Sequence, residues 1–508
     1  MMGEIQMKIE KINNALSFNA SMGGLSNALY TLSNNDMLNA SFVDVFAMDT
    51  PRTVVEAKNR GKQAGIEMGF REYTGTFIAE FSAALFAVFA SKFIAKKLKP
   101  EVKVNSSSWI TNNGLDVFSK IYEKSNKTPK GYVKGIFDSM YGISGHKTVE
   151  FSKLKKEKSL SIIEKLANLI SNRSVKDKNL KKTLSEIQDE IISLSGADNN
   201  ITIKSGSSQV SSNLTHALRD IVDSGRNIFF AETKQNSGHI VSKLKSMNNL
   251  RIGIAIPLSM GLAITNQYLN RYLTKRRTGI DNFVGENGYD QHVAAKNEKK
   301  KEKGLWLKKI LSAGVFVLML TKVMGVKKPL DFVKKLEFDG PVTSGNAIKT
   351  IYGTLILGRI FASKDSTELR ETNVRDYLGF LNWLVLGGFV SKGVAQMLDP
   401  KQEKLFNITK KGTGIKHWLR DISLKSQKEI LAGGGDVKAN LRKLNFAQIS
   451  GILYSAVMLG VLLPKLNIWM TKGKAKNEEK VAKKEIISNE INFKSAHVSM
   501  EKFVKGKK

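Results

Sequence analysis

The chain of 508 residues contains no cysteine. This absence excludes disulfide bonds, iron–sulfur clusters, cysteine nucleophiles and every zinc site that needs a thiolate ligand. The six histidines supply no metal motif either, because no two of them are three or four residues apart and the chain has no HExxH motif. The sequence therefore predicts no metal site and no cofactor.

Signatures of catalysis are also missing. The loop around Gly142 and Gly145 has a nearby Lys-Thr pair, but His146 separates Gly145 from Lys147 and the upstream glycine of a phosphate-binding loop is absent. The Gly433-Gly434-Gly435 run lacks the order of a dinucleotide loop. A nucleophile elbow and a kinase signature are absent as well. We therefore predict a non-enzymatic protein with no catalytic residues.

Acidic residues are scarce relative to basic ones. The 46 Asp and Glu face 80 Lys and Arg, which gives a formal net charge of +34. Such a surface attracts phosphate, either in the anionic headgroups of a bilayer or in nucleic acid. The aromatic residues lie mostly in apolar stretches and not among the lysines, so the pattern does not support stacking on bases. Lipid headgroups are the predicted partner, and nucleic acid remains the alternative.

Six apolar stretches are the main positive feature. The clearest are Leu444 to Pro464, twenty-one uncharged residues, and Ile252 to Asn270, nineteen uncharged residues. About 20 helical residues cross a bilayer core about 30 Å thick, so both are long enough. The other four run from Thr74 to Ser91, Ile310 to Thr321, Gly345 to Ser363 and Tyr377 to Ser391.

These stretches define the predicted architecture: an all-α, multi-helix, membrane-embedded bundle with an additional polar helical domain. Residues 1–73 form a polar region with a glycine-striped helix, and residues 74–98 the first apolar helix. Residues 99–250 form the polar, soluble domain. Residues 251–464 contain about five apolar helices with basic loops, and residues 465–508 a basic tail with twelve Lys and five Glu, a net of +7.

Within the polar domain, two segments have apolar residues at helical spacing. One face carries Leu160, Ile163, Leu166, Leu169 and Ile170, and the other carries Leu180, Leu184, Ile187, Ile191 and Leu194. A polar break, residues 171–174, separates them. This pattern predicts an amphipathic helical hairpin.

Glycines recur at i, i+4 and i+8 near the N-terminus. Asp49-Thr50-Pro51 is typical of a helix start, and Gly61, Gly65 and Gly69 would then form one smooth stripe on that helix. Close approach of a second helix would explain three residues that each cost about 1 kcal/mol relative to alanine. The alternative is a frayed or kinked helix.

Small residues are also frequent inside the apolar stretches. They are Gly314, Gly353, Gly358, Gly387, Gly388, Gly451, Ser455 and Gly460. Helices that associate in lipid favour small residues at their contacts, because hydrophobicity alone does not drive association there. These positions are predicted sites of close helix packing.

Three ionisable residues lie inside the apolar stretches. Glu80, Lys349 and Arg359 are functional candidates because a charge in hydrocarbon is costly. One hypothesis is a Glu80–Arg359 pair in the bundle interior. The alternative is that Lys349 and Arg359 extend to the interface while Glu80 lies at headgroup depth.

The sequence does not define an orientation, since Lys and Arg flank most stretches on both sides. Buried helices of a soluble protein are therefore an open alternative. The favoured function is a non-enzymatic membrane component, a scaffold or part of a helical assembly with protein partners or copies of itself. One alternative is a transporter or channel with helix breaks at Pro257 and Gly387-Gly388. Another is a soluble nucleic-acid-associated protein.

Overall fold

The computed structural model describes residues 23–98, 110–141, 156–172, 177–196, 198, 201–229, 237–279, 303–338, 344–408 and 412–471. The loop from Gly142 to Thr148 and the tail beyond residue 471 lie outside these ranges. The described chain is mostly helical with a few short strands, which confirms the predicted all-α class.

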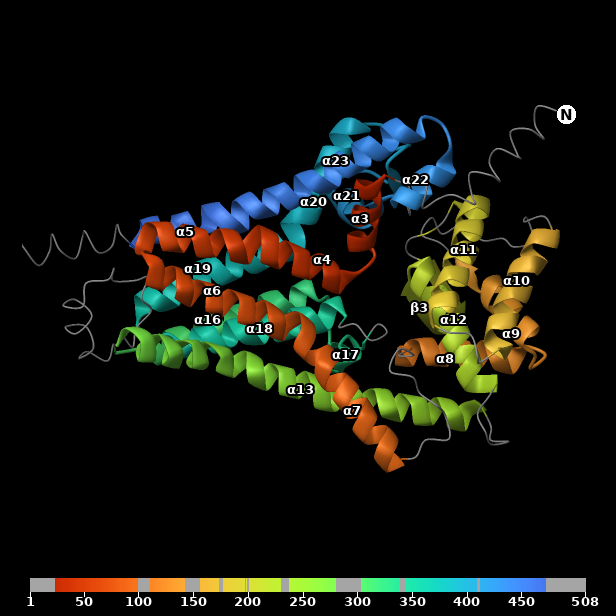
Figure 1. Ribbon diagram of the computed structural model, residues 1–508, viewed down its shortest axis with the longest axis horizontal. Coiled ribbons are helices and arrows are strands. Elements are labelled where there is room, and N and C mark those ends of the chain that lie inside the picture. Colours follow the sequence, from red (N-terminus) through yellow and green to blue (C-terminus); the bar gives the residue numbers. More distant parts are fainter. Residues whose placement is uncertain are drawn as a thin grey trace, which may run out of the picture.

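Seven helical runs lie side by side along the long axis and form what we call the helical body (Figure 1). Consecutive runs point in alternating directions. They are α4 (Asp36–Phe42) with η1 (Val43–Asp49) and α5 (Thr50–Arg60); α6 (Lys62–Phe77) with η2 (Ile78–Ser82) and α7 (Ala83–Leu98); α13 (Ser237–Thr278); α16 (Leu305–Val323); α18 (Gly345–Ala362); α19 (Ser366–Leu381) with η3 (Asn382–Leu386) and α20 (Gly387–Leu398); and α23 (Val437–Ser455) with η4 (Ala456–Leu462).

Among the described residues, three helices are long and apolar enough to cross a membrane: Lys62–Phe93, Gly238–Thr278 and Val437–Thr471. They contain the predicted stretches that begin at Thr74, Ile252 and Leu444. The other three predicted stretches do not meet this standard. α18, for example, has thirteen of its 18 residues buried. It lies between α13 and α16, so its apolar side chains pack inside the protein.

The polar domain has its own core. It contains α8 (Asn112–Lys124), α9 (Pro129–Asp138), α10 (Lys156–Ser171), α11 (Asp177–Ser195) and α12 (Leu214–Phe229). α10 and α11 confirm the predicted hairpin, and they bury the predicted apolar faces except for Leu160, which is 51% exposed, and Leu194, which packs against the edge of the core. An antiparallel sheet that was not predicted joins them, in the order β1 (Met140–Tyr141), β2 (Ile201–Ser205), β3 (Ser208–Ser212).

Several of the predicted boundaries fall inside helices, including the one between residues 464 and 465, because the last helical run continues to Thr471. The boundary between residues 73 and 74 lies inside α6, and the boundary between 250 and 251 lies inside α13. α13 places Ile240 and Leu244 in the core of the polar domain, and Ala255 and Ala263 in the core of the helical body. Composition changes along α13 without any break in its backbone. The 42-residue helix, about 63 Å long, therefore joins the two parts.

A second connection lies at α22 (Gln427–Gly433). This helix belongs to a small insertion between α20 and α23 that also contains β4 (Phe406–Ile408), α21 (Ile415–Arg420) and β5 (Ile422–Leu424). Lys428 Nζ lies 2.7 Å from Asp189 Oδ1 on α11, and Ser426 Oγ donates to Asp198 Oδ2 over 2.8 Å. The hydroxyl of Tyr30 on α3 (Gly24–Ser33) joins the same group through Asp198. Buried polar contacts therefore fix the polar domain to the insertion.

A third contact involves Glu337, which follows α17 (Pro329–Lys334). Its carboxylate accepts from the Asn112 backbone N–H at the start of α8, over 3.3 Å. Asp116 and Lys245 face it from α8 and α13, and burial raises the pKa of Glu337 to about 7. The side chain is therefore protonated in the folded protein under mildly acidic conditions.

This junction predicts a pH effect on stability. The Glu337 pKa rises from 4.5 in the unfolded chain to about 7 in the folded one, so the folded state binds more protons within this interval and stability falls as pH increases through it. After allowance for the partial exposure of the side chain, we expect the free energy of unfolding to fall by about 1–2 kcal/mol across this interval. Glu337→Gln should remove the contribution of Glu337 to this slope. Above about pH 7 the variant should therefore be more stable than the wild type. Thermal unfolding of both proteins across this range measures the effect, and identical profiles would contradict it.

Candidate functional site

A network of buried charges lies inside the helical body. It is centred on Glu72 of α6, which is 1% exposed. One carboxylate oxygen, Oε2, lies 3.3 Å from Arg359 Nη2 of α18 and 3.6 Å from Arg52 Nη1 of α5. The other, Oε1, lies 3.3 Å from Arg71 Nε. One carboxylate therefore contacts three guanidinium groups from three helices.

Asp376 of α19 is the second acid of this network. Its Oδ1 accepts from Arg359 Nη1 over 3.1 Å and from Arg375 Nε over 2.8 Å. Arg359 thus bridges Glu72 and Asp376, while Arg52 Nε donates to the backbone oxygen of Leu459 on η4 over 2.8 Å. Together these contacts tie α5, α6, α18, α19 and η4 to one another.

A separate ionic cluster lies where α5 ends. Arg60 Nη1 donates to Glu371 Oε2 over 3.1 Å and also pairs with Glu56 one turn earlier. The Thr471 hydroxyl donates to the same Glu371 carboxylate. This cluster holds α5, α19 and the end of the last helical run together.

Three further acids line the inner side of η1 and η2. Asp49 Oδ2 accepts from the Thr76 hydroxyl over 2.8 Å, and Glu80 accepts from the Ser41 hydroxyl. Asp44 is completely buried, and its two carboxylate oxygens have no hydrogen-bond partner among the described residues. The helical body therefore buries more acidic groups than the sequence stretches indicated.

The hypothesis of a Glu80–Arg359 pair is wrong. Arg359 pairs with Glu72 and Asp376, whereas the Glu80 carboxylate accepts from the Ser41 hydroxyl of α4. Arg359 does not extend to an interface either, because it is only 3% exposed. Lys349 is half-buried in the first turns of α18.

The predicted glycine stripe is divided between a turn and a helix. Gly61 ends α5 with φ +97°, a conformation that L side chains rarely adopt, so it makes the turn into α6. Gly65 and Gly69 lie on α6, where an added Cβ would meet Ala57 at 2.5 Å and Thr53 at 3.2 Å on α5. The helix does not begin at Asp49, because the backbone is already helical there and the Asp49 side chain points to Thr76.

The expected helix breaks at Pro257 and Gly387 are also wrong. Pro257 lies inside the continuous α13, and Gly387 has right-handed helical angles, φ −58° and ψ −44°, at the passage from η3 to α20. The helical runs remain unbroken through both positions.

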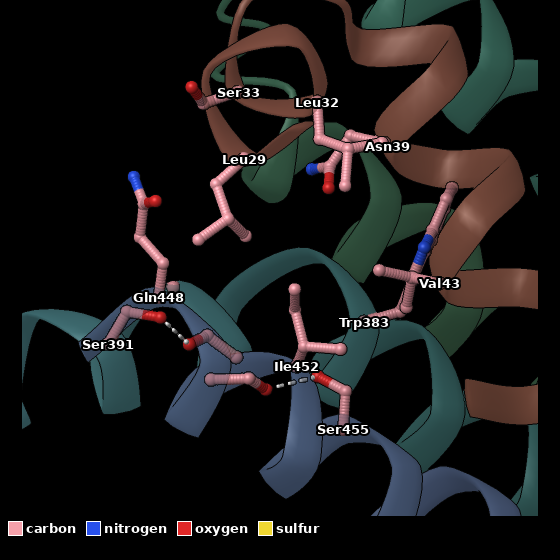
Figure 2. A pocket seen from close by; sticks show the side chains of 13 residues that line it. Leu29, Leu32, Ser33, Asn39, Val43, Trp383, Ser391, Gln448, Ile452 and Ser455 are labelled. Atoms are coloured by element: carbon pink, nitrogen blue, oxygen red, sulfur yellow. Dashed lines mark hydrogen bonds between the residues drawn. The ribbon is translucent and has the colours of Figure 1, made fainter. Parts of the chain in front are cut away.

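A cavity of about 200 Å³ lies between α3, α4, α20 and α23 (Figure 2). Leu29, Val43, Trp383 and Ile452 give it apolar walls, and Asn39 and Gln448 contribute amide groups. Ser391 and Ser455 donate to the backbone oxygens of Gly387 and Gly451, so their hydroxyl protons are already used. The lining carries no charged side chain.

Within the part of the chain that the structure describes, no three His, Asp or Glu side chains form a group suited to a metal ion. Comparison of the chain with family models, curated proteins and solved structures finds no match. The geometry of the described residues is thus the basis for any functional inference.

Proposed function

We propose that this protein is a membrane-embedded helical scaffold without enzymatic activity, which holds the polar domain at a bilayer. The observation that carries the proposal is the location of exposed apolar side chains. On the helical body they include Leu262 (43% exposed), Val315 (57%) and Val457 (51%). Between residues 110 and 229 the described chain exposes one large apolar side chain, Leu160.

An exposed apolar surface of this kind needs a cover. Monomeric soluble proteins rarely expose large contiguous apolar patches, and the three longest apolar helices have only 33–50% of their most apolar window buried inside the protein. Acyl chains would cover α13 and the α23–η4 run, which lie at opposite edges of the body in Figure 1, and also α16, which exposes Leu311, Val315 and Leu318. Lipid is therefore the cover that we propose.

The buried network favours a structural role over transport. Arg52, Arg71 and Arg359 contact Glu72 within the protein, and these ion pairs tie α5, α6 and α18 together. The cavity of Figure 2 is lined by uncharged side chains. Buried ion pairs between helices fix helix positions, and an uncharged cavity offers no charged partner to a passing ion.

Membrane fractionation tests this proposal. We expect the protein to pellet with membranes and to stay there in alkaline carbonate. Leu262→Lys should lower insertion and yield, because a lysine near the centre of a span costs about 2.5–3.5 kcal/mol. Leu160→Lys is the matched control, with a similarly exposed leucine in the polar domain, and should be neutral. Quantitative release by carbonate, or equal behaviour of the two variants, would refute the proposal.

A further inference from the structure

One end of the helical body, which we call the α18–α19 end, contains the turn between α18 and α19 together with one end of each of the five other runs. Lys308 Nζ donates to Ser366 Oγ over 2.8 Å, and Arg271 pairs with Glu368, which brings α16 and α13 to this turn. Arg370 Nη2 donates to Thr471 Oγ1 over 2.9 Å, which brings the last run there. In Figure 1 this end lies opposite the polar domain.

The exposed charged side chains that the structure describes at this end are all basic. Its exposed cations include Lys62, Lys275, Arg276, Arg277, Lys308 and Lys364. Among the described residues there, the acids are buried or half-buried: Glu368 and Glu371 are ion-paired, and Asp365 caps α19. An outward surface with cations and no exposed acid attracts phosphate groups.

Aromatic side chains form a second layer just inside these cations. Tyr268 (48% exposed) and Tyr272 (60%) lie on α13 before Lys275, Trp306 (65%) lies in the first turn of α16, and Trp469 (71%) lies near the end of the last run. Exposed Trp and Tyr are typical of the interface between acyl chains and headgroups. Among the described residues, one further Trp or Tyr is exposed. This is Tyr73, whose hydroxyl forms a hydrogen bond with the hydroxyl of Thr50.

The opposite end of the body also exposes lysines, such as Lys92 and Lys322, but the described residues there include no exposed Trp or Tyr. The polar domain and the α22 insertion lie at that end. Along α13, Arg271 lies 20 residues from Arg251, which is buried at the junction with the polar domain, and this distance of about 30 Å is the thickness of a bilayer core. Two interfaces therefore fit on this helix, with the polar domain beyond Arg251.

We propose that the α18–α19 end contacts anionic phospholipid headgroups, and that the polar domain lies on the opposite side of the bilayer. This inference rests on the proposed membrane function and adds to it a topology and a lipid class. It explains why cations and interfacial aromatics occur together at the ends of α13 and α16, which a soluble surface does not require.

The absence of cysteine makes the topology directly measurable, because each introduced thiol is the only one. We choose Arg276→Cys at the α18–α19 end and Lys134→Cys in the polar domain, both exposed positions. In sealed membrane vesicles, an impermeant maleimide should modify one of them and reach the other only after permeabilisation. Modification of both from the same side of intact vesicles would overturn the topology.

The lipid class needs a second measurement. A bimane attached to Trp306→Cys should be quenched by brominated phosphatidylglycerol at a lower mole fraction than by brominated phosphatidylcholine, in nanodiscs that contain both lipids. The added change Arg276→Gln with Arg277→Gln should reduce this preference roughly tenfold or more. Equal quenching by the two lipids before that change would overturn the headgroup assignment.

The two proposals fail in different ways. If the helical body does not enter a bilayer, carbonate releases the chain and neither brominated lipid quenches the bimane. If the body is embedded but our inference is wrong, the chain resists carbonate while the two cysteines react from one side or the bimane shows no preference.

Discussion

Glu72→Gln should destabilise the protein by about 3–5 kcal/mol, the largest effect that we expect from a single substitution. The amide has nearly the size of the carboxyl group, so the change removes charge and little volume. Arg52, Arg71 and Arg359 would then face one another in a buried site, with Asp376 compensating only Arg359 and Arg375. The free energy of unfolding in detergent micelles, from a denaturant titration, measures the loss.

A control and a rescue separate this cause from a general sensitivity to substitution. Glu164→Gln removes a carboxylate that pairs with Lys130 on the surface, where the two side chains are 55% and 63% exposed, and should change stability by less than about 1 kcal/mol. Adding Arg359→Met to Glu72→Gln removes one surplus cation and should restore part of the loss. A double variant less stable than Glu72→Gln alone, or a single variant that matches the wild type, would contradict the explanation.

The sequence predicts the positions of the helices better than it predicts which charged residues are buried between them. Apolar runs such as Ile252 to Asn270 and the periodic leucines of the polar domain determine helix positions because each pattern acts locally. Arg71-Glu72 and Arg375-Asp376 stand just before apolar stretches, where charges normally mark the end of a span. In the structure these residues are buried, and Arg359 of α18 pairs with both Glu72 and Asp376.

Some signals of the missed features are present in the chain. Arg52, Glu56 and Arg60 recur every four residues and share one helix face, which indicates a charged contact surface on α5. Residues 201–205 begin with Ile alternating with Thr and Lys and are followed by Gly206, a pattern typical of a strand that enters a turn. The charged face of α5 does not reveal which residues it contacts. The acids that pair with Arg60 and Arg359 come from helices distant in sequence.

Small residues were the most informative sequence signal for packing. An added Cβ at Gly353, Gly358, Gly387, Gly451 or Gly460 would meet an atom of a neighbouring helix within 3.0 Å, whereas Gly314 and Gly388 have nothing within 4 Å. The pattern thus identified helix contacts, since close approach needs a missing side chain at a definite place. It did not identify which helix would approach.

Gly358→Ala should be the second large effect. Its Cβ would lie 2.7 Å from the backbone oxygen of Ile264 and 3.0 Å from its Cα, and a backbone cannot rotate away as a side chain can. α13 and α18 would have to separate. The ion pairs of the next residue, Arg359, with Glu72 and Asp376 would shift with them. We expect a loss of about 1–3 kcal/mol, measured by the same denaturant titration.

Gly261→Ala supplies the matched comparison, because this glycine lies on α13 one turn from Ile264 and an added Cβ there meets nothing within 4 Å. Alanine favours the helix by about 1 kcal/mol over glycine, so this variant should be neutral or slightly more stable. If both alanines stabilise the protein, α13 and α18 are not in backbone contact. If both destabilise it equally, the effect belongs to the glycines of these helices in general and not to the approach at Ile264.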